Sequence, residues 1–217
     1  MTVLDRLGLE MEYPEEQTCC GQPAFNSGYR GVAGSLAERF IALFEGSEAV
    51  VAPSGSCVAM VRKHYVEIFR NNPSWLERAQ RLSTKVFEFS EFLAKILGKT
   101  DLGARFPHRV TYHDSCSVLR SIGVREEPRA LLRAVDGIDL VEMEDSDRCC
   151  GFGGTFAVKF ADLSSVLLED KVEKIGKSGV EFVVGCEISC LMNIESAIRR
   201  QGIPIKTIHL AELLART

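Results

Sequence analysis

The chain has 217 residues, of which 46% are hydrophobic and 26% are charged, and its formal net charge is −4. These values are typical of a globular protein that buries its own core, and the lack of a basic surplus argues against binding to nucleic acid or to an anionic membrane surface. Because no apolar run approaches the roughly 18 to 20 residues that span a bilayer and the first residues lack the pattern of a signal peptide, we expect a cytoplasmic protein without a membrane span.

The first half of the chain, residues 1–103, is predicted to be a small α/β unit. A short helix at residues 3–7 precedes the triplet Cys19-Cys20-Gly21. An apolar strand at residues 50–52 then runs into a Ser-Cys turn at Cys57 and a helix.

A polar stretch at residues 71–78 separates that helix from the next strand. Pro73 is expected to begin a helical turn there with Asn72 as its cap, which makes the stretch a surface insertion. A second strand at residues 87–89 leads into an amphipathic helix. The predicted boundary follows at residues 98–107, where Gly, Asp and Pro cluster.

The second half, residues 104–217, repeats these elements in the same order, and it has a further strand before them and another before the cysteine triplet. The first of these two strands, at residues 109–113, ends shortly before Cys116. The later segments are a helix around residues 130–132, a strand at 138–141, the triplet Cys149-Cys150-Gly151, a strand at 183–184 before the Ser-Cys pair at Cys190, and a strand at 208–210 that leads into the last helix.

The matching order indicates an internal repeat. Strands that alternate with helices predict an α/β fold of two repeated Rossmann-like units with mainly parallel sheets. In the first repeat nothing corresponds to the strand at residues 109–113 or to Cys116. We therefore expect the first unit to lack its N-terminal strand and its first cysteine.

Eight cysteines in a reducing compartment point to metal binding more than to disulfides. Sites in parallel sheets gather at the carboxyl ends of strands, and Cys57, Cys116 and Cys190 follow predicted strands, so they could converge. The second repeat offers five thiols for a metal, and the first repeat offers three for a second site. These are Cys116, Cys149, Cys150, Cys186 and Cys190 in the second repeat, and Cys19, Cys20 and Cys57 in the first.

The number of thiols bears on the kind of metal. Thiolate sulfur suits both iron and zinc, but a single zinc ion takes at most four protein ligands. A fifth cysteine therefore favours an iron-sulfur cluster, and zinc stays open as the alternative.

The glycines at Gly151, Gly153 and Gly154 do not have the spacing of a phosphate-binding loop. They are expected to let the backbone approach a cofactor and donate N–H groups to its sulfurs. His113 and Arg120 flank Cys116, and each has two interpretations. His113 either tunes or binds the metal or is a strand-end histidine bonded to backbone. Arg120 either offsets the negative charge of the metal centre or is a solvated helix arginine.

These cysteine phrases resemble the cysteine-rich CCG domain found in heterodisulfide reductase and in the iron-sulfur subunit of glycolate oxidase, and the resemblance covers essentially the whole chain. It matches Cys116, Cys149, Cys150 and Cys190 in the second repeat to the family motif, with Cys19, Cys20 and Cys57 in the first. The family pattern ends in two cysteines separated by two residues. Cys186 and Cys190 are separated by three, and Pro53 stands opposite Cys186, so Cys186 departs from the pattern.

The resemblance implies an iron-sulfur electron-transfer subunit, with noncubane 4Fe-4S clusters in the heterodisulfide reductase relatives. It implies a complex that oxidises L-lactate, or a related 2-hydroxy acid such as glycolate, to the 2-oxo acid, with partner subunits that include a ferredoxin-like iron-sulfur protein. The chain has no flavin or nicotinamide fingerprint, so lactate itself is expected to react elsewhere. Two alternatives stay open: a zinc-stabilised scaffold that binds partners, and a thiol-disulfide reductase of the heterodisulfide reductase type.

Overall fold

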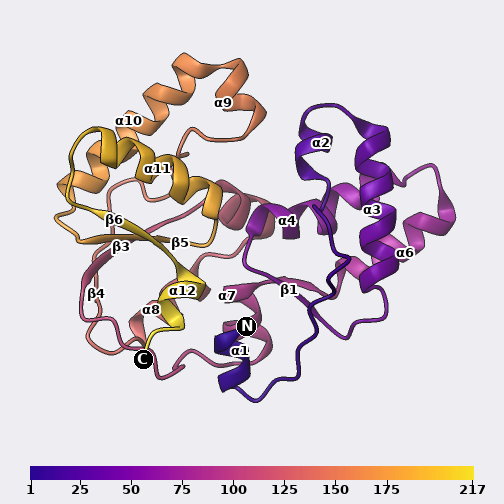
Figure 1. Ribbon diagram of the computed structural model, residues 1–217, viewed down its shortest axis with the longest axis horizontal. Coiled ribbons are helices and arrows are strands. Elements are labelled where there is room, and N and C mark those ends of the chain that lie inside the picture. Colours follow the sequence, from indigo (N-terminus) through magenta and orange to yellow (C-terminus); the bar gives the residue numbers. More distant parts are fainter.

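The computed structural model describes residues 1–217 as two parallel sheets with helices on their faces (Figure 1). In the first half, β1 (Val50–Ala52) pairs with β2 (Val86–Glu88). In the second half the sheet has the order β4-β3-β5-β6 and every pairing is parallel. Its strands are β3 (Arg109–His113), β4 (Asp139–Leu140), β5 (Phe182–Gly185) and β6 (Lys206–His209). This confirms the predicted α/β fold with parallel sheets.

The internal repeat is visible in the order of elements. β1 leads into α4 (Gly55–Ala59) and β5 leads into α11 (Ile188–Arg200). The last residue of β2 caps α7 (Phe89–Glu91), and the last residue of β6 caps α12 (Leu210–Leu214). The two-stranded sheet of the first half contains no counterpart of β3 or β4.

The remaining helices cover the sheets. α10 and α11 lie over one face of the four-stranded sheet and α8 and α12 over the other, while α2, α3 and α6 lie together in the first half (Figure 1). Their bounds are α1 (Thr2–Arg6), α2 (Gln22–Asn26), α3 (Arg30–Phe44), α5 (Tyr65–Ile68), α6 (Pro73–Ser83), α8 (Glu126–Arg133), α9 (Thr155–Lys159) and α10 (Ala161–Lys177), with single π-helical turns η1 (Met60–His64), η2 (Phe92–Ile96) and η3 (Ser117–Ser121).

The predicted surface insertion is a helix, α6, and its start is as expected. Pro73 is its first residue, and the Asn72 side chain accepts a hydrogen bond from Trp75 N at 3.5 Å. The Asn72 oxygen thus satisfies one of the backbone donors that a helix start leaves free.

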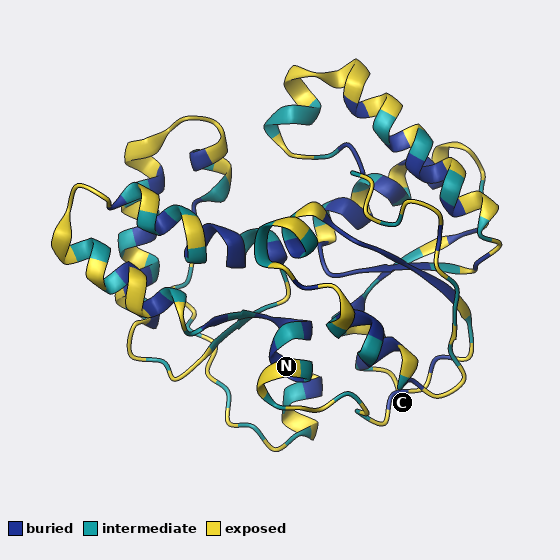
Figure 2. Cartoon of the chain, turned by 180° about the vertical axis from the view of Figure 1, so that it is seen from behind, coloured by how far each residue is buried: buried dark blue, intermediate teal, exposed yellow.

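Buried residues lie on the inner faces of the helices and in the strands, and exposed residues lie on the outer faces and in loops (Figure 2). The largest core cluster draws on both halves of the chain: Val3, Phe89 and Leu93 pack with residues of the second half such as Val110 and Leu131. The division into residues 1–103 and 104–217 describes the sequence repeat and stays a prediction. The largest hydrophobic cluster extends across this boundary.

The carboxyl ends of the strands bring the cysteine-bearing turns together. β3 and β5 are neighbours, with His113 opposite Gly185. α4 packs directly on η3, and a Cβ on Gly55 would lie 2.4 Å from Val118 Cγ2, so only glycine allows this approach. None of the helices combines the length and the apolar character that crossing a membrane requires.

Candidate metal centre

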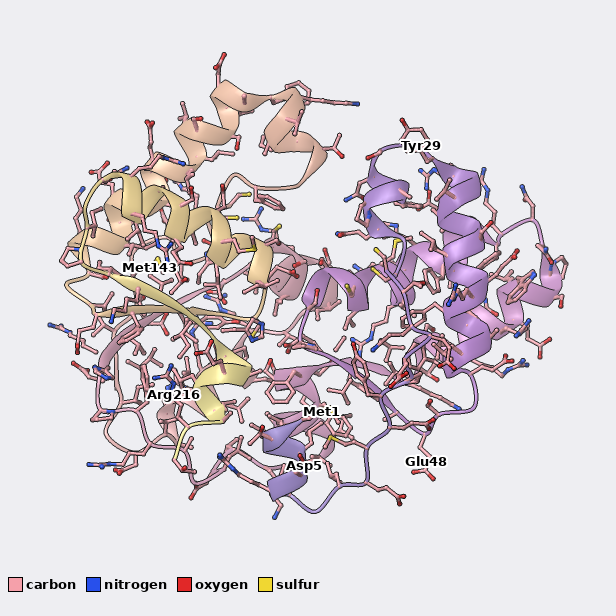
Figure 3. The ribbon with its side chains drawn as sticks, in the orientation of Figure 1. Met1, Asp5, Tyr29, Glu48, Met143 and Arg216 are labelled. Atoms are coloured by element: carbon pink, nitrogen blue, oxygen red, sulfur yellow. The ribbon has the colours of Figure 1, made fainter.

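Four thiols of the second repeat form one group, and they come from three separate segments. Cys116 lies between β3 and η3, Cys149 and Cys150 lie in the loop before α9, and Cys190 lies in the first turn of α11. The Cys150 thiol lies beside those of Cys149 and Cys190, and the Cys116 thiol lies beside that of Cys149. Figure 3 shows sulfur atoms gathered beside the start of α11.

The contacts within this group favour thiolates at two positions. Contact with Cys116 is the largest cause that holds the pKa of Cys149 well below its usual range, and contact with Cys150 lowers the pKa of Cys190 to about 6. The same contacts raise the pKa of Cys116 and of Cys150. Since the thiolate is the form that binds metal, the donor set fits a thiophilic metal.

The backbone beside Cys149 is shaped for a sulfur contact. Gly151 N donates a hydrogen bond to Cys149 Sγ at 3.3 Å. Gly151 has a φ of +82°, and a Cβ on it would lie 2.4 Å from Ser164 O, so another residue would not fit. The carbonyls of Gly153 and Gly154 accept the hydrogen bonds that begin α9.

His113 adds an imidazole to the thiol group. Its side chain is buried, and neither ring nitrogen has a hydrogen-bond partner. A ring nitrogen of His113 and the sulfurs of Cys150 and Cys190 all lie within 4.8 Å of one another. The interpretation as a strand-end histidine bonded to backbone therefore does not match the structure.

Arg120 matches the solvated interpretation. Its side chain is 60% exposed, and Nη2 donates a hydrogen bond to Asp147 O at 3.0 Å. This bond ties η3 to the loop that precedes Cys149.

Cys186 belongs to a different environment. The Tyr112 hydroxyl donates a hydrogen bond to Cys186 Sγ at 3.3 Å, and complete burial raises the pKa of Cys186 well above its usual value. Its side chain is part of the core cluster that both halves share, whereas Cys150 and Cys190 belong to another. The structure thus does not bring Cys186 to the four thiols.

The first repeat places its thiols in a second group. Cys20 and Cys57 lie side by side, contact with Cys20 lowers the pKa of Cys57 to about 7, and Cys19 is exposed. Gly21 N donates to Cys19 Sγ at 3.4 Å, as Gly151 does to Cys149. Cys57 thus contacts a thiol of its own repeat.

Sequence reasoning missed Glu187, which joins the two repeats. This buried carboxylate accepts hydrogen bonds from Ser56 N at 2.9 Å, from Ser117 Oγ at 3.1 Å and from Ser54 Oγ at 3.3 Å. It therefore ties the turn before Cys57 to η3. Its position opposite Ser54 in the repeat was the available signal, since both residues precede the Ser-Cys helix.

A buried ion pair fixes the turn that carries Cys116. Arg129 Nη1 and Nη2 donate to Asp114 Oδ1 and Oδ2 at 2.9 and 2.7 Å, and the two side chains are only 5% and 2% exposed. Ser146 Oγ donates to Asp114 Oδ2 at 2.7 Å. The pair thereby links the end of β3, the helix α8 and the loop before Cys149, and its bidentate geometry makes it strong.

Comparison with known proteins agrees with the cysteine pattern. A family model described as a cysteine-rich domain, CCG, matches residues 1–62 and 110–195. A protein named lactate utilization protein A from Lysinibacillus sphaericus is 46% identical over 98% of this chain and 92% of its own length. Proteins of the same name from Macrococcus caseolyticus and Oceanobacillus iheyensis are each 45% identical over 98% of this chain and 86% of their length.

Proposed function

The chain belongs to the CCG cysteine-rich domain family, and on that premise we propose that it is an iron-sulfur electron-transfer subunit in the oxidation of lactate. The observation that carries the proposal is the meeting of four thiols from three distant segments. Cys116, Cys149, Cys150 and Cys190 would hold the cluster, and Cys19, Cys20 and Cys57 would form a second metal site. A bound cluster supplies one-electron transfer.

The residues around the four thiols support this role. Cys149 and Cys190 are held toward the thiolate form, and Gly151 N already donates to a ligand sulfur, which is a means of tuning a cluster. Cys150 and Cys190 are buried, so this side of the site excludes water. Cys116 is exposed, which leaves a route for electrons to a partner.

The link to lactate rests on the relatives, whose name is lactate utilization protein A. We propose L-lactate as the substrate of the complex, with glycolate as the closest chemical alternative. The chain contributes electron transfer and a partner subunit contributes the oxidation of the hydroxy acid, with a ferredoxin-like iron-sulfur subunit as a second partner. Exposed apolar side chains on α9 and α10 and at the residue between them, among them Val158, Phe160 and Val166, support such a contact.

Zinc is the second candidate, because His113, Cys150 and Cys190 alone would suit a mononuclear site. Anaerobic purification of the full chain followed by iron, sulfide and zinc analysis separates the two. We expect a brown protein with near-equal iron and sulfide, loss of iron in Cys190→Ser, and retention in the control Cys186→Ser. Colourless protein that carries zinc would refute electron transfer and favour the scaffold.

The substrate is tested separately on the isolated complex. Reduction of the cluster on anaerobic addition of L-lactate, faster than with glycolate, is the expected result. Reduction by neither acid would overturn the lactate assignment and leave the metal assignment intact.

A further inference from the structure

His113 is a buried polar group for which the protein itself provides no partner. It is the last residue of β3, only 1% of it is exposed, and both ring nitrogens are unpaired. Leaving a buried polar group unpaired is destabilising, and native proteins pair nearly all such groups. The position therefore calls for a specific partner.

The neighbouring residue does not provide that partner. Successive side chains of a strand point to opposite faces, and the Asp114 oxygens are bonded to Arg129 and Ser146. The groups that do lie beside the His113 ring are the sulfurs of Cys150 and Cys190, all three within 4.8 Å.

We propose that His113 is a nitrogen ligand of the metal centre in the second repeat, next to Cys150 and Cys190. This inference rests on the proposed metal binding but not on the identity of the metal. Metal-sulfur and metal-nitrogen bonds of about 2.3 and 2.0–2.1 Å place two ligands of one tetrahedral metal roughly 3.5 Å apart. Side-chain shifts of about 1 Å would bring the three donors to that spacing.

An imidazole in this place changes the properties of the centre. It is neutral, so it adds a ligand to the four thiolates without adding negative charge. Histidine in place of cysteine raises the reduction potential in iron-sulfur centres. The centre would thereby be easier to reduce than one with a fifth thiolate in the position of His113.

The test uses Co²⁺ as the probe, titrated anaerobically into the metal-free, reduced full chain, because bound Co²⁺ reports its ligands through visible absorption. His113→Ala is expected to weaken Co²⁺ binding by roughly 100-fold. This is at least as large as the loss of affinity seen when a residue that only hydrogen-bonds a metal ligand is removed. His113→Cys is expected to restore tight binding and to add thiolate charge-transfer absorption. His64→Ala is the matched control, since His64 is paired with Glu67 near the surface.

His113→Gln decides between a ligand and a mere hydrogen-bond donor. An amide donates hydrogen bonds but is a poor ligand for thiophilic metals, so this variant should behave like His113→Ala. Binding equal to wild type in His113→Gln, or unchanged binding in His113→Ala, would overturn the proposal. Wild-type protein that does not bind Co²⁺ through thiolates would overturn it as well.

The iron-loaded protein gives an independent readout. Pulsed electron paramagnetic resonance should detect a coupled imidazole nitrogen in the wild type that is missing in His113→Cys. If the wild type takes up zinc and no iron, the electron-transfer proposal fails while the Co²⁺ titration still decides the role of His113.

Discussion

Replacement of Arg129 by methionine tests whether the buried ion pair holds the metal-binding turn. Arg129 donates two hydrogen bonds to Asp114 and two to Glu142, and its side chain is 5% exposed. Removal of one partner of a buried pair costs about 3–5 kcal/mol, because the other charge stays buried without compensation. For a chain of this size each kcal/mol shifts Tm by about 2–4 °C, so Arg129→Met should lower Tm by about 6–20 °C.

The assay is thermal and urea unfolding of the metal-free protein at neutral pH. The matched control is Arg133→Met on the same helix, whose side chain is 58% exposed and lies 3.8 Å from Glu126. An exposed pair of this kind contributes at most about 1 kcal/mol. Equal losses in the two variants, or a loss below about 1 kcal/mol in Arg129→Met, would refute the reasoning.

The pH dependence of the same variant checks the cause. Burial alone would raise the pKa of Asp114, but the hydrogen bonds from Arg129 and Ser146 outweigh it and hold the pKa below its usual value. A carboxyl group with a lowered folded-state pKa stabilises the fold above its unfolded pKa, and this contribution is lost as pH falls through the folded pKa. The difference between wild type and Arg129→Met should thus be full at neutral pH and shrink below about pH 4.

Three further changes test other contacts. Gly151→Ala places a Cβ 2.4 Å from Ser164 O at a φ of +82°, so urea unfolding should show a loss of unfolding free energy above the ~1–2 kcal/mol that a left-handed backbone costs by itself. The control Gly46→Ala, at a position with nothing near the new Cβ, should lose under about 1 kcal/mol. Equal losses in the two variants would contradict the clash. Glu187→Ala leaves a backbone amide and serine hydroxyls without their acceptor and should cost about 1–3 kcal/mol in urea unfolding; no loss would mean that the bridge between the repeats is not stabilising. Cys186→Ala should leave the iron content unchanged, and loss of iron would make this thiol a ligand after all.

The elements of the fold were predictable because their signals are local. The apolar runs before Cys57 and Cys190 gave β1 and β5, and Asn72 with Pro73 gave the start of α6. Each of these depends on residues a few positions apart. The three π-helical turns were not foreseen, since no local pattern distinguishes them from ordinary helical turns.

The grouping of the candidate site was only partly predictable. The repeat identified the cysteines of both sets, and Cys57 lies beside Cys20 of its own set. The packing of α4 on η3, which brings the turns of Cys57 and Cys116 to the same side of the molecule, could not be predicted from the spacing. Glu187 and Arg129 make their bonds to residues far away in the chain. Such contacts depend on how separate helices and strands pack against each other, and the spacing of apolar residues along the sequence does not predict that packing.

The shared interior has a mechanical consequence. Because Val3 and Phe89 pack in the same cluster as Val110 and Leu131, the two halves are joined by shared core packing as well as by the polypeptide. Separating the two sulfur groups would require breaking these contacts. In the proposed electron-transfer role, this packing would keep the tunnelling distance between the two sites constant.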